Sequence, residues 1–408
     1  MSKSVKHRLI LDRWAICAAA IAGLVVMPIF AVIWLAFFPT ENIWPHLMAT
    51  SLPRYLSNSL IIMGAVAVCA SVIGTFCAWM VVTKEFPMRR VLEWALLFPL
   101  AIPAYIGAYA FVDFWEYAGP AQTMLRDLFG WETSRDYYFP AVRSRGAAIF
   151  VISLSLYPYV YLLARAAFRE QSSRTIEVAR ALGAGPVRAF WAVALPLARP
   201  AIAIGTALVM MEALYDVGAV EFFAVQTLTT GIFTVWLESS NVGGAAQIAV
   251  VIFTVVMVLV MLERYSRRKM RVHQRHNQST PPVRALLGLR RGLIVSILCS
   301  LPVLFGFIMP LLIMFDHALN VQGLWSDTVF LRAAWTSIWV GLVAAFVTVG
   351  AAIVLIFSIR SSRSDTPKLL APVATIGYAA PGAVLAVGIL IPLAFFDRNL
   401  ADIVEALT

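Results

Sequence analysis

The amino-acid sequence predicts an all-α polytopic membrane protein. Of its 408 residues, 61% are hydrophobic and only 13% are charged, about half the charged share of an ordinary soluble domain. The hydrophobic residues fall in long runs that match the roughly 20 residues an α-helix needs to cross a bilayer. No stretch shows the short dyad alternation of an outer-membrane β-barrel. The composition therefore excludes a soluble protein, and the pattern favours a helical bundle.

Nine hydrophobic segments are long enough to form tilted transmembrane helices. The first follows a basic leader, but its hydrophobic run is well beyond the 7–15 residues of the apolar part of a signal peptide. We therefore expect it to remain as an uncleaved anchor. The nine segments lie at approximately 14–38, 56–83, 91–112, 147–165, 198–220, 245–263, 292–315, 333–359 and 369–396.

The basic residues predict the orientation of the chain. If the N-terminus is cytoplasmic, most of the 32 Lys and Arg residues fall in segments on the cytoplasmic side, as the positive-inside rule requires. The net charge of +10 then reflects membrane topology and gives no reason to expect nucleic acid as a partner. We predict a multi-pass protein with a cytoplasmic N-terminus.

A basic, proline-broken stretch at 264–291 divides the chain into two predicted modules. The first, 1–263, has six expected spans. The second, 292–408, has three. Polar, charged segments of this kind are typical of linkers.

Short motifs suggest that the second module repeats the architecture of the first. The Met-Pro pair at 27–28 recurs at 309–310, and the proline-ended triplet at 101–103 recurs at 379–381. A counterpart of the first module's inner loop, 166–197, would fall beyond Thr408. We therefore expect a second module that is incomplete, either because the sequence is a fragment, which we favour, or because the second half is degenerate.

The sequence predicts no metal site and no cofactor. The four cysteines lie inside hydrophobic runs, where cysteine acts as a small apolar residue, and no Cys or His spacing indicates ligands or a disulfide framework. His273 and His276 lie in the basic linker, where solvated side chains beside anionic lipid are expected. The cysteines are Cys17, Cys69, Cys77 and Cys299.

The inner loop at about 166–197 is predicted to form a helical elbow. One short helix is expected from about Ser173 to Leu182, followed by a turn at Gly183–Pro186. Glycine permits unusual backbone angles at such a turn, and proline readily begins the next helix. A second short helix is expected to run to Leu195 and to be ended by Pro196.

This loop resembles the cytoplasmic coupling loop of the membrane permease subunits of ABC importers. The family pattern is Glu-Ala-Ala, three residues, Gly, nine residues, and then Ile-x-Leu-Pro. Val178 and Val193 depart from it, replacing Ala and Ile with other apolar residues. The matching positions are Glu177, Val178, Ala179, Gly183, Val193, Leu195 and Pro196.

The resemblance implies a type I permease helical bundle in the bacterial inner membrane. It implies two ATPase subunits bound at the cytoplasmic face and a periplasmic substrate-binding protein on the other side. The sequence has no GxxxxGK[ST] phosphate loop, no HExxH and no supported Ser/His/Asp set, so nothing indicates an enzyme. ATP is expected to be hydrolysed by the partner subunits.

The segment after the loop, 211–236, resembles ferric-iron importer permeases in which two modules are fused in one chain. This resemblance implies ferric iron as cargo. Thiamine, polyamine or phosphonate cargoes, carried by the same type of importer, remain open, as does a secondary transporter, which is less favoured because it does not need a coupling loop. The matching positions are Glu212, Asp216, Gly218, Thr229, Thr230, Gly231 and Ile232.

Glu212 and Asp216 are candidates for the translocation pathway or its gate. They are four residues apart in a hydrophobic segment, so a helix would place them on one face. Ionisable groups inside a membrane are costly and are functional candidates by default. Two structural alternatives remain: Asp216 lies at the wet outer end of the span, or Glu212 is paired inside the bundle.

Overall fold

The computed structural model of the chain describes residues 12–171, 181, 183–268, 284–321, 323, 326–375, 377 and 380–407. Contacts divide the chain into two compact units. The terminal unit comprises Met1–His46, Ile232–Val256 and His317–Thr408. The central unit comprises Leu47–Gly231 and Met257–Asp316.

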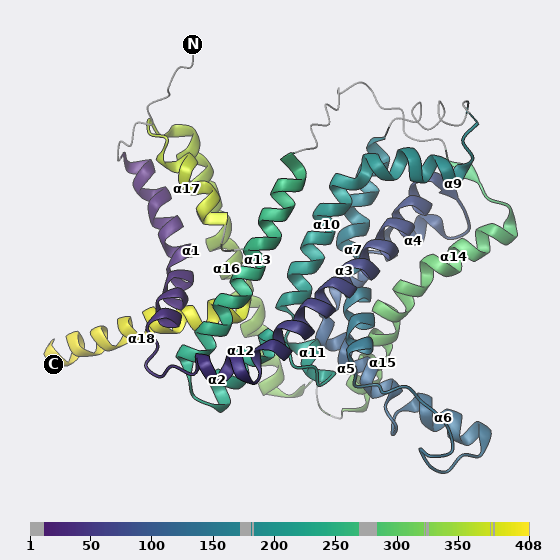
Figure 1. The fold of residues 1–408 in the computed structure, drawn as a ribbon, viewed down its shortest axis with the longest axis horizontal. Helices are drawn as coiled ribbons and strands as arrows, with labels where there is room; N and C mark the ends of the chain where they lie inside the picture. Colours follow the sequence, from purple (N-terminus) through teal and green to yellow (C-terminus); the bar gives the residue numbers. More distant parts are fainter. Residues whose placement is uncertain are drawn as a thin grey trace. The chain divides into compact units, whose positions relative to one another are not determined.

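The described residues are almost entirely helical (Figure 1). In chain order the elements are α1 Arg13–Phe37, α2 Trp44–Ala49, α3 Leu52–Thr83, β1 Lys84–Glu85, α4 Arg89–Ala95, the 3-10 helix η1 Phe98–Ala101, α5 Ala104–Trp115, α6 Pro120–Phe129, α7 Arg145–Glu170, α9 Pro186–Ala189, the π-helical turn η2 Phe190–Ala194, α10 Leu195–Tyr215, α11 Gly218–Phe222, α12 Leu228–Phe233, the π-helical turn η3 Thr234–Glu238, α13 Val242–Arg268, β2 Ala285–Leu286, α14 Leu289–Val303, the π-helical turn η4 Leu304–Ile308, α15 Met309–Asn320, α16 Thr328–Ser361, α17 Thr366–Thr375 and α18 Gly382–Leu407.

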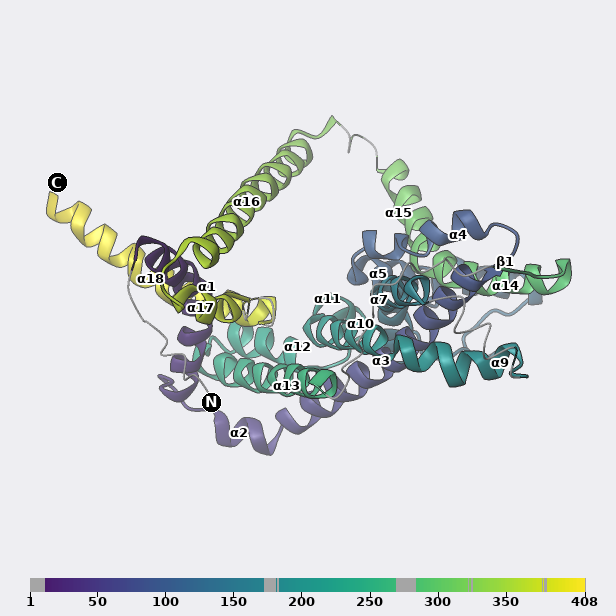
Figure 2. The same cartoon turned by 90° about the horizontal axis from the view of Figure 1, so that it is seen from above.

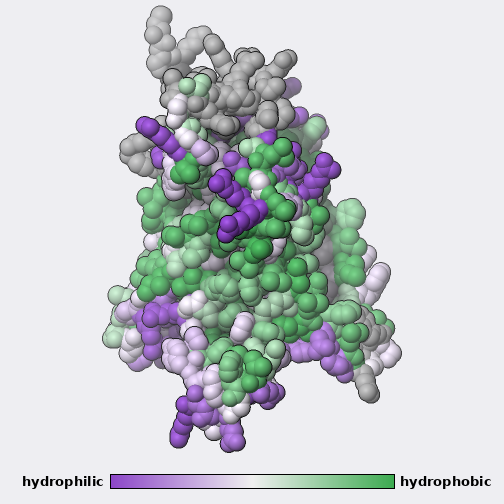
Figure 3. Space-filling model, turned by 90° about the vertical axis from the view of Figure 1, so that its right-hand side faces the viewer, coloured by the Kyte–Doolittle hydropathy of each residue, from purple (hydrophilic) through white to green (hydrophobic). Residues whose placement is uncertain are grey.

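The predicted polytopic helical architecture is confirmed. Among the described residues, eight helices are long and hydrophobic enough to cross a membrane, or nine if one bent pair counts as a single span. Hydrophobic side chains form a broad band across the face shown in Figure 3, with hydrophilic side chains beyond it at both ends. Leu293, Ile294 and Ile297 of α14 are among the exposed apolar residues that a bilayer would cover.

Two expected spans are interrupted in the structure. The segment predicted at 91–112 is a pair, Arg89–Ala101 and Ala104–Phe129, bent by 92°. Ile102, at the bend, is extended, as sterics favour for a residue that precedes a proline. The segment predicted at 369–396 is divided between α17 and α18, and Pro381 directly precedes α18.

The core of the central unit is formed by α3, α7 and α10, which pack closely on one another. Two glycines allow this approach. A Cβ atom on Gly74 of α3 would lie 2.8 Å from the carbonyl oxygen of Tyr157 in α7, and one on Gly205 of α10 would lie 2.9 Å from the Cα of Val160. Tyr157 and Tyr161 are fully buried between these helices.

Two π-helical turns precede prolines. In η2 the Leu195 N–H donates to the Phe190 carbonyl, and Pro196 follows; in η4 the Met309 N–H donates to the Leu304 carbonyl, and Pro310 follows. Proline has no N–H and its ring clashes with the carbonyl four residues earlier. A wider turn at this point accommodates both, so the helix continues.

The first span of each predicted module packs on helices of the other module. In the terminal unit α1 packs on α16, α17 and α18, and Figures 1 and 2 both show it beside α17. Asp12 caps α1 by accepting the Ala15 N–H at 2.7 Å. Its carboxylate also accepts the Ser362 hydroxyl at 2.9 Å and the Arg363 N–H at 2.9 Å, and these hydrogen bonds, the one from Ala15 above all, lower its pKa.

The reciprocal contact lies in the central unit. Helix α14 packs on α3 and α4, and η4 packs on η1 and α7. The end of the linker is fixed there as well, because Lys84 and Glu85 of β1 pair in parallel with Ala285 and Leu286 of β2. The Ser296 hydroxyl of α14 donates to the Pro87 carbonyl at 2.6 Å.

Candidate coupling elbow and outer gate

The structure has a turn where the sequence predicts the elbow. Gly183 has a φ of +87°, in the left-handed region that glycine adopts without strain. Gly185 then caps α9 with a φ of −64°, and Pro186 occupies the first turn of that helix, where its missing N–H costs no hydrogen bond. Positions Glu177, Val178 and Ala179 and most of the first expected helix lie outside the described residues.

The second helix of the elbow does not end at Pro196, which corrects the prediction. Helix α9, the η2 turn and α10 form one helical run of 30 residues, Pro186–Tyr215. The π-helical turn just before Pro196 removes the clash that would otherwise interrupt the run. Val193 lies in that turn, while Leu195 and Pro196 begin α10. The elbow is therefore continuous with the fifth span.

Both ends of the loop are attached to the core. Gln171 directly follows α7, and its amide nitrogen donates to the Ala194 carbonyl of η2 at 2.9 Å in a buried position. This hydrogen bond joins residues 23 positions apart, one on each side of the loop. A displacement of the elbow would therefore be transmitted to both α7 and α10.

An ion-pair cluster around the nearly buried Glu93 carboxylate lies where α7 leaves the core. Glu93 of α4 forms ion pairs with Arg89 at 3.1 Å, Arg165 at 3.2 Å and Arg169 at 2.7 Å. The Tyr161 hydroxyl donates to the Glu93 carbonyl at 2.9 Å. The sequence did not predict this Glu93 cluster, and the only local signal for it is the i, i+4 spacing of the opposite charges Arg89 and Glu93.

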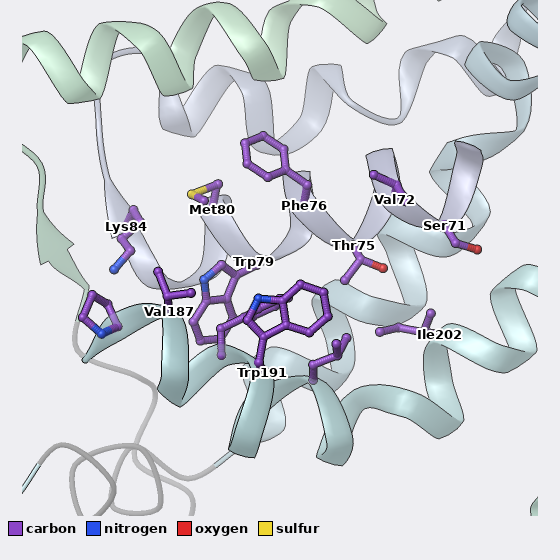
Figure 4. A pocket seen from close by; sticks show the side chains of 13 residues that line it. Ser71, Val72, Thr75, Phe76, Trp79, Met80, Lys84, Val187, Trp191 and Ile202 are labelled. Atoms are coloured by element: carbon purple, nitrogen blue, oxygen red, sulfur yellow. The ribbon is translucent and has the colours of Figure 1, made fainter. Parts of the chain in front are cut away.

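A groove lies between α3 and the elbow helices (Figure 4). Its volume is about 570 Å³, and its lining is almost wholly apolar. Trp79 of α3 and Trp191 of η2 contribute indole rings to it, and among the described residues Lys84 is the only charged one that lines it. Trp79 also packs against Phe190, with ring centroids 5.0 Å apart.

The opposite end of α10 carries the two predicted gate residues. Glu212 lies in the last turn of α10, and Asp216 is the cap residue whose N–H donates to the Glu212 carbonyl at 3.1 Å. The Asp216 carboxylate turns to the next element and accepts the Ala219 N–H of α11 at 2.7 Å. Asp216 therefore holds α11 against the end of the fifth span, and Glu212 remains the acid within the span.

Helix α11 is also held at its other end. Arg143 donates to both carboxylate oxygens of Glu116, at 2.9 and 3.2 Å, and to the Phe222 carbonyl at 3.1 Å. At the start of the helix, a Cβ atom on Gly218 would lie 2.7 Å from the Cβ of Tyr105 in α5. The short helix is thus packed tightly over α5.

The remaining predicted residues pack the chain after α11 onto α3. The Thr229 hydroxyl donates to the Asp216 carbonyl at 3.0 Å, and the Thr230 hydroxyl accepts the Thr227 N–H at 2.8 Å. Gly231 lies where a Cβ would be 2.6 Å from the ring of Tyr55. Ile232 is fully buried. All four residues lie in α12, and their contacts fix this helix to the end of α10 and to α3.

Comparison with known proteins places this arrangement in a family. Residues 70–272 match the family model described as binding-protein-dependent transport system inner membrane component. Over 353 residues, 85% of this chain, the sequence is 26% identical to an Fe(3+)-transport system permease protein of Haemophilus influenzae. That alignment covers 64% of the relative, so the chain spans less than two thirds of its length.

Two further proteins are similar to the chain. Over 201 residues it is 26% identical to the molybdenum transport system permease protein of Escherichia coli. That alignment covers 48% of this chain and 84% of the relative. A bacterial alginate ABC transporter, solved in complex with an alginate pentasaccharide-bound periplasmic protein, matches 62% of this chain and 92% of its own with a TM-score of 0.50 and 17% identity. The latter likeness shows the shared fold. Residues 70–272 therefore belong to the family of binding-protein-dependent transport system inner membrane components.

Proposed function

We propose that the chain is the transmembrane permease subunit of an ATP-driven importer in the bacterial inner membrane, and that it carries ferric iron delivered by a periplasmic binding protein. Two ATPase subunits bind at the cytoplasmic face and hydrolyse ATP, so this chain performs translocation only. The N-terminus is cytoplasmic, which places the elbow beside the ATPases and α11 on the periplasmic side.

The observation that carries this proposal is the continuous helical run from the elbow to Tyr215, directly before Asp216 and α11. At 1.5 Å per residue, the 30 residues of Pro186–Tyr215 extend about 45 Å. A movement imposed on α9 by an ATPase would therefore reach Asp216, whose carboxylate holds α11. Because Gln171 attaches the elbow to α7 as well, the movement would act on two core helices together.

Iron is favoured by the similarity to an Fe(3+)-transport permease, which aligns with 85% of the chain, and by the charge of the gate. Glu212 and Asp216 place two carboxylates at the periplasmic end of α10. Like charges repel, so this end disfavours oxyanions such as molybdate and is compatible with a cation. A permease must also release its cargo, so we expect these carboxylates to shape the field of a cavity and not to form a strong metal site.

The test is uptake of radioactive iron by cells that carry the complete transporter. Glu212→Gln combined with Asp216→Asn removes two charges but keeps size, and Asn still caps a helix well. We expect iron uptake to fall several-fold at unchanged expression. Glu221→Gln is the matched control, because Glu221 is an exposed acid of α11 outside the span, and it should transport normally.

Molybdate is the second candidate cargo, because the molybdenum permease aligns over 84% of its length. Uptake of labelled molybdate without uptake of iron by the unmodified transporter would replace iron with an oxyanion and leave the importer assignment in place. Unchanged iron uptake in the double variant would instead remove Glu212 and Asp216 from the pathway.

A further inference from the structure

The groove beside the elbow extends over about one leaflet of a bilayer. Its α3 wall runs from Ser71 to Lys84, which at 1.5 Å per residue is about 20 Å. Half of a hydrocarbon core roughly 30 Å thick is about 15 Å. The groove is closed at the Ser71 end, which is far from Lys84. There the Ser71 and Thr206 hydroxyls are hydrogen-bonded at 2.6 Å and hold α3 against α10. A helix that crosses the whole membrane would need a longer groove.

The two ends of the groove differ in chemistry. Figure 4 shows Lys84 at one end, beside Val187, and Ser71 at the other. Lys84 caps the end of α3 that we expect at the cytoplasmic surface, and Arg188 follows Val187 on exposed α9. Between the ends the walls are apolar, and Trp191 is 63% exposed at the groove. Indole rings are typical of the membrane–water interface.

An amphiphile with an anionic head and an apolar tail fits both ends. Basic residues at the cytoplasmic surface attract anionic lipid headgroups, and a volume of about 570 Å³ lies within the range of sites that hold small ligands. We propose that an anionic phospholipid of the cytoplasmic leaflet binds here, with one acyl chain in the groove and its phosphate at Lys84. This lipid site rests on the proposed orientation of the chain in the membrane and is independent of the cargo.

A bound lipid would connect the elbow to the core. One wall of the groove is α3, and the other is the run of α9, η2 and the start of α10. An acyl chain between the two walls makes dispersion contacts with both of them. Separating the walls would break these contacts, so the bound chain resists the separation. The lipid therefore supports the orientation of the elbow helix.

The test is native mass spectrometry of the purified, delipidated full chain, titrated with dioleoylphosphatidylglycerol or with zwitterionic dioleoylphosphatidylcholine. We expect one phosphatidylglycerol to bind more tightly than phosphatidylcholine. Lys84→Gln should weaken phosphatidylglycerol binding about fivefold, the effect of the roughly 1 kcal/mol that a basic residue contributes near anionic lipid. Lys368→Gln, a change at an exposed lysine in the first turn of α17, should leave it unchanged.

A second pair of variants tests the groove itself. Val72 lines the groove and Val68 does not, yet both are on α3 and both are 64% exposed. Val72→Trp should fill the groove and abolish the tight site, whereas Val68→Trp should preserve it. Equal binding by these two variants, or equal affinity of the unmodified chain for both lipids, would overturn the proposal.

Discussion

At the scale of single residues, the elbow depends on two glycines with different tasks. Gly183 has a positive φ and Gly185 does not, while no atom of the described residues lies within 4 Å of a Cβ added at either position. Space is therefore equal at the two positions, and only the backbone conformation distinguishes them. For an L-residue the left-handed conformation costs roughly 1–2 kcal/mol.

We predict that Gly183→Ala reduces cargo uptake and transport-linked ATP hydrolysis several-fold, because the added Cβ shifts the turn away from the conformation that orients α9. Membrane insertion should be normal, since the spans do not depend on the elbow. Gly185→Ala serves as the control and should behave like the unmodified protein in both assays. Equal activity of the two variants would show that the turn geometry is unimportant for coupling.

The sequence predicted the residues of the turn but not the partners of Glu93. Local chemistry was sufficient for the turn, because glycine and proline act on their own backbone. Glu93 was read as part of a hydrophobic span, since its partners Arg165 and Arg169 lie 72 and 76 positions away. Removing one member of such a buried cluster leaves charges uncompensated, and this pairing is visible only after α4 and α7 have packed.

At the scale of the elements, hydrophobicity located the spans but not their interruptions. The third span bends by 92°, and the fifth begins twelve residues earlier than expected, at Pro186. In both cases a proline is involved, and the backbone conformation just before the proline determines whether the helix ends or continues. Pro103 follows an extended residue and breaks the helix, whereas Pro196 follows a π-helical turn and does not. Composition alone does not distinguish these two settings.

The close packing of α3 on α7 gives a prediction at this scale. Gly74→Ala should lower the free energy of unfolding of the full chain by about 1–3 kcal/mol, the usual cost of overpacking a well-packed core. The reason is that the added Cβ would meet the Tyr157 backbone. Gly64→Ala on the same helix meets nothing within 4 Å and should be neutral or slightly stabilising. Thermal unfolding in detergent measures both, and an equal effect of the two changes would contradict the packing argument.

At the scale of the whole molecule, the two predicted modules are linked because the first span of each, α1 or α14, packs on helices of the other. We call this arrangement the exchange of first spans. The sequence indicated the modules by their linker and repeated motifs, but it could not show that α1 packs on α16, α17 and α18 or that α14 packs on α3 and α4. Such contacts join segments far apart in the chain, and hydrophobic segments of similar composition do not specify their neighbours. Small details decide them, such as the approach of Gly388 in α18 to the Pro28 backbone of α1.

We predict that the chain can be divided in its linker without separating its halves. Residues 1–268 and 284–408, expressed together as two polypeptides, should copurify through a tag on either one, because each contributes a helix to the packing of the other. Gly388→Val should weaken this association, since its side chain would collide with α1. Recovery of the tagged half alone, with both halves inserted, would contradict the exchange.

The packing of α1 also determines the order in which the protein can be completed during synthesis. Helix α1 is synthesised before its partners, which begin only at Thr328. At 5–20 residues per second, ribosomes need roughly 15–60 s to make the intervening chain. Throughout that interval α1 is surrounded by lipid or by other proteins, and Asp12 has yet to meet Ser362 and Arg363. The N-terminal helix is therefore inserted early but packed late, and mutations in α16 to α18 should expose the beginning of the chain to membrane proteases as readily as mutations in α1 itself.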